Sequence, residues 1–162
     1  MLKIEIKPYL DDYRDQIIDL ILKIQTEEFG VSISLDDQPD LKTIHRFYQK
    51  EDGNFWVALH GDRVVGTIAL LDIGNKQAAL RKMFVDGDYR GKEKGVAHAL
   101  LGELIAWCKN KKFQEIYLGT TSAYLAAHRF YEKNGFEEIP KSLLPASFPV
   151  MQVDSKFYRY KV

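Results

Sequence analysis

The chain has 162 residues, of which 46% are hydrophobic and 12% aromatic, so we expect a folded domain with a sizeable core rather than a disordered chain. Lys plus Arg and Asp plus Glu each total 23, and the net charge of zero argues against a protein that binds nucleic acid or membrane surfaces through charge. Cys108 is the single cysteine, no apolar run approaches membrane-spanning length, and the first residues do not resemble a signal peptide, so we predict a cytoplasmic protein without an internal disulfide.

The first third of the chain predicts one strand and two helices. Alternating apolar and charged residues over Leu2–Lys7 indicate a strand that stops before a proline. Asp11 or Asp12 can cap a helix that runs to about Phe29, because isoleucines recur along one of its faces and a glycine follows. After a loop, Leu41–Gln49 predicts a shorter helix, since apolar residues again recur at helical spacing.

The middle of the chain predicts three strands and a long helix. The strands are apolar runs separated by glycine-containing turns, which are typical of antiparallel neighbours. They cover Phe55–His60, Val64–Leu71 and Asn75–Val85. Gly95–Lys111 predicts a helix, because its alanine, leucine and cysteine side chains share one face and lysines gather near its end.

The last third predicts another strand, a helix and two late strands. Gln114–Gly119 is an apolar strand, and Ser122 can cap a helix that ends at Asn134-Gly135. The late strands cover Phe136–Ile139 and Phe157–Val162. The complete order, βααβββαβαββ, predicts an α/β (α+β) fold with a central mixed sheet flanked by helices on both faces, in a single domain over residues 1–162.

Residues 83–101 combine the features of an anion-binding loop. An apolar strand end leads through a basic, glycine-containing loop into a helix. The first amides of a helix have no intrahelical partner, and the helix dipole favours anions at that end. Lys92 and Lys94 add positive charge, while Gly91 and Gly95 let the backbone approach a ligand closely. We therefore predict that a ligand with phosphate groups binds here.

Two blocks of this sequence resemble the GNAT superfamily of N-acetyltransferases. That family has Gln/Arg-x-x-Gly-x-Gly/Ala before the helix, and this chain has Lys92-Glu93-Lys94-Gly95-Val96-Ala97, which departs from the pattern at its first position. The family's second block, Asn-x-x-Ala-x-x-x-Tyr-x-x-x-Gly-Phe, is matched by Ala127, Tyr131, Gly135 and Phe136, with Tyr124 in place of the Asn. Two blocks in this order are more specific than either alone, and the resemblance covers nearly the whole chain.

The resemblance implies acetyl-CoA as cofactor and acetyl donor, with no metal. The pantetheine arm is expected to pair with the main chain of the fourth strand, and the pyrophosphate to meet the amides of the loop. The residues expected to bind the cofactor are Met83, Phe84, Val85, Arg90, Gly91, Lys92, Glu93, Lys94, Gly95, Val96, Ala97 and Phe130. The four histidines are scattered, without partners at metal-ligand spacing.

Tyr131 is the predicted catalytic residue, because the resemblance assigns it the role of general acid that protonates the departing thiolate. From the sequence alone, an aromatic packed beside Phe130 and Phe136 on a helix face remains an alternative. The sequence does not identify a general base. The acidic residues that are candidates by charge are Glu27, Glu28, Asp72 and Asp154.

The predicted function is direct transfer of an acetyl group from acetyl-CoA to a primary amine in a ternary complex. The acceptor amine, on a small molecule or a peptide, is expected beside Glu27–Asp40 and Pro140–Ser155, the segments that resemble the family least. A homodimer is left open, and nucleic acid and membranes are not expected as partners. Two alternatives remain, a non-catalytic acyl-CoA-binding module and a protein-interaction domain.

Overall fold

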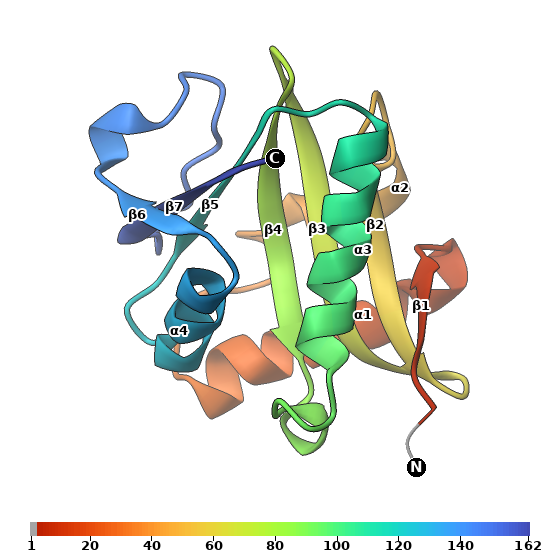
Figure 1. Cartoon of the computed structure of the whole chain (residues 1–162). Helices are drawn as coiled ribbons and strands as arrows, with labels where there is room; N and C mark the ends of the chain where they lie inside the picture. The colour runs from red at the N-terminus through yellow and green to blue at the C-terminus, as the bar shows by residue number, and fades with distance from the viewer. Residues whose placement is uncertain (1–2) are drawn as a thin grey trace.

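The computed structural model of the protein describes residues 3–162. This part of the chain forms seven strands in one mixed sheet with the spatial order β1-β2-β3-β4-β5-β7-β6 (Figure 1). The strands are β1 (Glu5–Pro8), β2 (Asn54–His60), β3 (Arg63–Gly74), β4 (Gln77–Val85), β5 (Glu115–Thr120), β6 (Glu137–Ile139) and β7 (Lys156–Lys161). The helices are α1 (Arg14–Leu22), α2 (Ile44–Tyr48), α3 (Val96–Asn110) and α4 (Leu125–Lys133). The predicted order βααβββαβαββ and the mixed α/β sheet are confirmed.

The first strand is shifted relative to its prediction. β1 begins at Glu5 and includes Pro8, whereas the predicted strand ended at Lys7. The predicted start, Leu2, lies outside the described residues. Pro8 is tolerated because β1 is an edge strand, where a residue without an N–H does not interrupt a ladder on both sides.

The two N-terminal helices are less uniform than predicted. The helix expected to reach Phe29 consists of a 3₁₀ turn at Asp11–Tyr13, then α1, then a π-helical segment at Lys23–Glu28. The helix expected over Leu41–Gln49 is a 3₁₀ turn at Pro39–Lys42 followed by α2, because the backbone of the intervening threonine is not helical. Single π-turns occur frequently at functional sites.

The predicted cap of the late helix is wrong. α4 begins at Leu125 with Tyr124 as its N-cap, and Ser122 lies in the preceding turn. In that turn Tyr124 N donates to Thr121 O over 3.2 Å, which delays the first helical residue. The predicted stop is close to the observed one, since Gly135, with a φ of +90°, follows the helix in the left-handed region.

Two apolar cores, one on each face of the sheet, hold the layers together. α3 and α4 cover one face through residues such as Leu100 and Tyr131, and α1 and α2 cover the other through residues such as Ile17 and Tyr48 (Figure 1). The central strands are therefore buried on both faces. This explains why they are continuous apolar runs rather than alternating patterns.

β4 and β5 are parallel neighbours that separate along their length. Their pairing joins Gln77–Ala79 to Glu115–Tyr117, although β4 continues to Val85 and β5 to Thr120. The edge of β4 that faces β5 is therefore open from Leu80 onwards. Backbone N–H and C=O groups need partners, so this edge is available to a ligand.

A β-bulge interrupts β4 at Lys82. Thr67 is opposite Phe84 whereas Ala69 is opposite Arg81, so β4 has one residue more than β3 between these pairs. Lys82 has a φ of +52°, and its carbonyl accepts a hydrogen bond from Thr67 Oγ1 over 2.6 Å. The extra residue changes which faces the following side chains occupy.

Candidate active site

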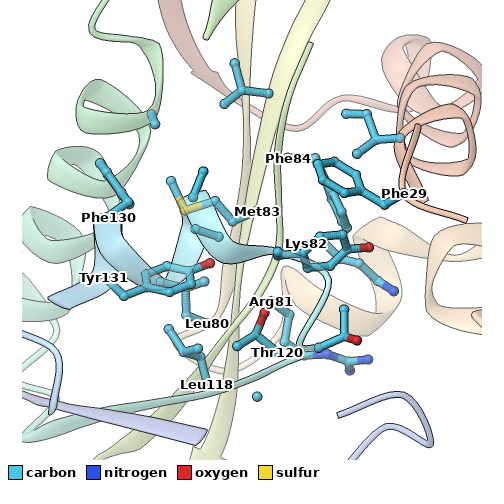
Figure 2. Close-up of a pocket in the computed structure, with 18 of the residues that line it drawn as sticks. Phe29, Leu80, Arg81, Lys82, Met83, Phe84, Leu118, Thr120, Phe130 and Tyr131 are labelled. Atoms are coloured by element: carbon cyan, nitrogen blue, oxygen red, sulfur yellow. The ribbon is translucent and has the colours of Figure 1, made fainter. Parts of the chain in front are cut away.

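A cavity of about 830 Å³ opens where β4 and β5 diverge. β4 lines it with residues 80–85, β5 with residues 118–120, and α4 with Phe130 and Tyr131. Figure 2 shows Tyr131 and Phe130 on one side of the cavity and Phe29 and Phe84 on the other. Its volume falls in the range of pockets that hold cofactors.

The loop before α3 forms one end of this cavity. Gly95 is the N-cap of α3 with a φ of +68°, a conformation that favours glycine, and a Cβ built there meets nothing within 4 Å. The amides of Lys94 and Gly95 donate back to Gly91 O over 3.1 and 3.3 Å. The amides of the first turn of α3, starting at Val96, have no intrahelical acceptor and remain available to an anion.

The structure brings most of the predicted site residues together around the cavity. Those that line it are Met83, Phe84, Val85, Arg90, Gly91, Lys92, Gly95, Ala97, Phe130 and Tyr131. Three other predicted residues do not line the cavity: Glu93, Lys94 and Val96. Val96 is buried in the core, Lys94 Nζ donates to Asp88 O, and the Glu93 carboxylate packs against Gly91. The side chains of these three residues therefore stabilise the loop and the helix start.

Arg90 joins the loop to the end of the π-helical segment. Its guanidinium forms a two-pronged ion pair with Glu28, and its Nε donates to Val85 O over 2.8 Å. The guanidinium also lies over the ring of Phe29, 5.6 Å from the centroid. Glu28, one of the four base candidates, is therefore engaged in an ion pair at the cavity wall.

Tyr131 lies where α4 meets the cavity, and only 6% of the residue is exposed. Its ring packs against Phe136 and Tyr158 with centroid distances of 5.6 and 5.9 Å. Burial, and to a lesser degree Tyr124, raises the pKa of the Tyr131 phenol above its ordinary value, so the hydroxyl keeps its proton at neutral pH. The ring thus belongs to the core while the residue lines the cavity (Figure 2).

Tyr124, which replaces the Asn of the family pattern, adds a large ring to the cavity wall. It meets Phe29 and Phe84 edge-on, with centroid distances of 5.0 and 6.1 Å. Burial, together with the charge of Glu28, raises the pKa of Tyr124 to about 12. An amide side chain cannot make these aromatic contacts, so the replacement changes the shape of the cavity at this point.

A cluster of buried charges, which the sequence analysis did not single out, lies beside β4. Lys82 Nζ is 3.5 Å from Asp40 Oδ2 and donates to Gln38 Oε1 over 2.5 Å. Tyr48 OH donates to the same oxygen of Asp40 over 2.5 Å. Burial lowers the pKa of Lys82 to about 8, against the opposing influence of Asp40. The signal in the sequence was the pair Arg81-Lys82 inside an otherwise apolar strand.

Of the four candidates for the general base, Asp154 lines the cavity and the other three do not. Its Oδ2 accepts a hydrogen bond from Met151 N over 2.9 Å, and burial raises the pKa of its carboxyl group. Asp72 instead accepts hydrogen bonds from the backbone amides of Asp52 and Gly74, and Glu27 is exposed. The segment between β6 and β7 therefore supplies the acidic group of the site.

The described residues, 3–162, include no group of three or more His, Cys, Asp or Glu side chains placed to hold a metal ion. Three of the four histidines have other partners. His45 Nδ1 pairs with Gln49 Oε1 at 2.8 Å, His60 Nδ1 with Tyr89 OH at 2.6 Å and His128 Nε2 with Thr121 O at 2.9 Å. No helix in the same part of the chain is both long and apolar enough to cross a membrane.

Comparison with known sequences identifies the family. The profile of the acetyltransferase (GNAT) family matches residues 18–136, which include the loop before α3 and all of α4. The N-acetylaspartate synthetase of Xenopus tropicalis is 38% identical over 104 residues, which make up 62% of this chain and 37% of that protein. The chain thus spans little more than a third of the length of this relative.

Comparison with solved structures supports the same family assignment. An acetyltransferase of the GNAT family from Staphylococcus aureus Mu50 is 41% identical, with a TM-score of 0.95 over 98% of this chain and 99% of that one. The PaiA N-acetyltransferase of Thermoplasma acidophilum, solved in complex with coenzyme A, is 20% identical with a TM-score of 0.75, over 99% of this chain and 100% of that one. That second likeness shows the shared fold. The chain belongs to the GNAT acetyltransferase family.

Proposed function

We propose that the protein transfers an acetyl group from acetyl-CoA to a primary amine, with both substrates bound at once in the cavity between β4 and β5. The observation that carries this proposal is the divergence of the two strands. It surrounds one cavity with an open strand edge, a helix N-terminus and a buried tyrosine. The thioester of acetyl-CoA supplies the activated acyl group.

The residues around the cavity fit a long ligand with one anionic end. The first turn of α3 and Lys92 would bind the pyrophosphate, because helix amides and a lysine favour phosphate oxygens. The open edge of β4 at Met83–Val85 offers backbone groups to the amides of a pantetheine arm. Phe130 adds an apolar wall on the α4 side.

The reaction breaks the C–S bond of the thioester and forms a C–N bond. An acceptor that arrives as an ammonium ion loses one proton before it attacks and a second as the amide forms. One of these protons ends on the thiol of CoA and the other passes to solvent. The site therefore needs a proton acceptor near the amine and a proton donor near the sulfur.

Asp154 and Tyr131 are suited to these two roles. The raised pKa of Asp154 makes its carboxylate a better proton acceptor than an exposed aspartate. Tyr131 keeps its proton and can donate a hydrogen bond to the departing sulfur. An ordinary thiol has a pKa near 8.5, below that of this phenol, so net transfer of the phenol proton to the departing thiolate is unfavourable. Tyr131 therefore acts by donating a hydrogen bond that stabilises the developing negative charge on sulfur, and the proton that completes the thiol is one of the two released by the amine.

The test combines calorimetric titration of acetyl-CoA and CoA with an assay of free CoA release over a panel of primary amines. We expect CoA to bind and release to depend on an amine. Binding without release over a broad panel would support the non-catalytic acyl-CoA-binding module instead. Failure of CoA to bind at millimolar concentration would overturn the proposal and favour the protein-interaction domain.

A further inference from the structure

We propose that the acceptor is a primary amine that also carries a carboxylate, as a free amino acid does. In this proposal Arg81 and Lys82 bind the carboxylate, and Asp154 faces the amine. The inference rests on the proposed acetyl transfer and specifies its second substrate.

The β-bulge puts two consecutive basic side chains on one face of the sheet. In a regular strand, neighbouring side chains point to opposite faces. Here the Arg81 guanidinium lies over the rings of Phe47 and Tyr48, 5.7 and 5.9 Å from their centroids, while Lys82 reaches Asp40 on the same α2-covered face. Both basic residues line the cavity (Figure 2). The bulge therefore concentrates positive charge beside the site of transfer.

The two cations are not equally neutralised. Lys82 has the carboxylate of Asp40 3.5 Å away. Arg81 forms no ion pair with any residue of the described chain, and the hydrogen bond of its Nη2 goes to Met151 Sδ over 3.2 Å. A thioether sulfur is a weak acceptor, whereas the planar guanidinium has five donors arranged to match a carboxylate. Arg81 therefore offers an anion site within the cavity.

Asp154 supplies the opposite charge in the same space. It lines the cavity, and the charges of Arg81 and Lys82 act on its carboxyl group. The formal charges of Arg81, Lys82, Asp40 and Asp154 sum to zero, which suits a ligand that is itself a zwitterion. A carboxylate placed on Arg81 and Lys82 would leave the ammonium group to face Asp154, where its deprotonation begins. A lysine side chain within a polypeptide has no carboxylate beside its amine, so it matches this arrangement less well.

The first test compares amines that differ only in the carboxylate. Free amino acids, β-alanine and γ-aminobutyrate are each compared with the compound in which every carboxylate is replaced by a primary carboxamide. CoA release is followed at saturating acetyl-CoA, and rates are expressed per deprotonated amine. We expect the best acid to exceed its carboxamide at least about 100-fold in kcat/KM, because sites built around a polar group reject analogues that lack it.

The second test removes the free cation. Arg81→Gln should raise KM for the acid about 10- to 150-fold, the range for losing one hydrogen bond between charged groups, with a smaller change in kcat. It should leave the carboxamide rates and the calorimetric affinity for CoA unchanged. Arg81→Lys should restore part of the acid preference. Arg46→Gln, which removes an exposed arginine of α2, is the matched control and should change neither KM nor kcat.

The outcomes separate this inference from the function on which it rests. Equal rates for acids and carboxamides, or an unchanged acid preference in folded Arg81→Gln, would overturn the inference and leave acetyl transfer intact. CoA release with none of the amines would overturn both. If Arg81→Gln does not fold, the paired substrates on the parent protein still decide the question.

Discussion

The carboxylate of Asp154 lies directly against the backbone of Gly119 in β5. A Cβ built on Gly119 would be 2.6 Å from Asp154 Oδ2 and 3.1 Å from Phe157 Cε1. Real Cβ atoms essentially never approach another heavy atom to less than 3.0 Å, so a side chain at residue 119 would collide with Asp154 Oδ2. The absence of a side chain there therefore leaves room for the carboxylate. The position of the proposed base thus depends on a glycine from a distant part of the chain.

Gly119→Ala should therefore displace Asp154 and slow acetyl transfer. We expect kcat to fall up to about 100-fold, the cost of misplacing a reacting group by about an ångström. Affinity for CoA should change much less. Gly102→Ala is the control, because a Cβ there meets nothing within 4 Å and alanine favours the middle of α3. Equal kcat values for the two variants would show that Asp154 does not act from this position.

Asp154→Asn should lower the rate without lowering stability at pH 7. Removing a general base typically costs about 10²–10⁴-fold in rate. The asparagine oxygen can still accept from Met151 N, which preserves the loop. A variant with parental kcat, or one whose melting temperature falls by many degrees, would contradict the proposed role.

The stability of Asp154→Asn should depend less on pH than the stability of the parent does. Burial raises the pKa of Asp154 above its ordinary 3.8, so the unfolded chain releases this proton first as pH rises. Above pH 3.8 the folded state holds more protons at this site, and its contribution to stability falls as pH rises through the folded-state pKa. Thermal melts from pH 4 to 7 should therefore show a smaller loss of stability in Asp154→Asn than in the parent.

Tyr131→Phe keeps the ring in the core and removes the hydroxyl proposed to donate a hydrogen bond to the departing sulfur. We expect kcat to fall about 10²–10⁴-fold once chemistry limits turnover, while CoA affinity and melting temperature change little. Tyr158→Phe is the control, since Tyr158 OH donates to Glu132 Oε2 over 2.6 Å but Tyr158 does not line the cavity. That variant should lose stability and retain kcat. A Tyr131→Phe rate within about threefold of the parent would assign the residue to packing alone.

Gly95→Glu tests the loop before α3. The substitution adds bulk and negative charge where the pyrophosphate is proposed to bind, so CoA affinity should fall strongly. Gly61→Glu is a closely matched control. Gly61 has a φ of +62° against +68° for Gly95, and a Cβ at either position meets nothing within 4 Å. Backbone strain should therefore lower the free energy of unfolding of both variants by a similar amount, roughly 1–2 kcal/mol. Calorimetry should find weakened CoA binding in Gly95→Glu alone.

Asp40→Asn should destabilise the protein by about 3–5 kcal/mol at neutral pH, because it leaves Lys82 as a buried charge without its partner. The loss should shrink as pH rises through about 8, the pKa of Lys82, since a neutral amine no longer needs the carboxylate. Chemical unfolding of parent and variant at pH 7 and pH 9 measures this difference. A loss that is the same at both pH values would show that the Lys82 charge is not its cause.

Local sequence patterns predicted most of the elements. The long apolar face of α3 and the Asn134-Gly135 stop of α4 depend on neighbours along the chain, so they were recognisable. The errors occurred where local signals compete. Ser122 is a good capping residue, but a turn ending at Tyr124 delays α4, and Pro8 is acceptable in a strand because β1 is at an edge.

The sequence by itself determined the family and identified the loop that is proposed to bind the cofactor, because these depend on residues close together in the chain. Gly95, Tyr131 and their blocks carry that information directly. The sequence named Asp154 and the segments expected beside the acceptor, but only the tertiary structure decided how the groups of the proposed acceptor site meet. The bulge at Lys82 results from pairing with β3, and the meeting of Asp154 with Gly119 and of Lys82 with Asp40 joins residues from separate segments. No local pattern encodes such contacts, since burial and pKa depend on which distant groups the fold brings together.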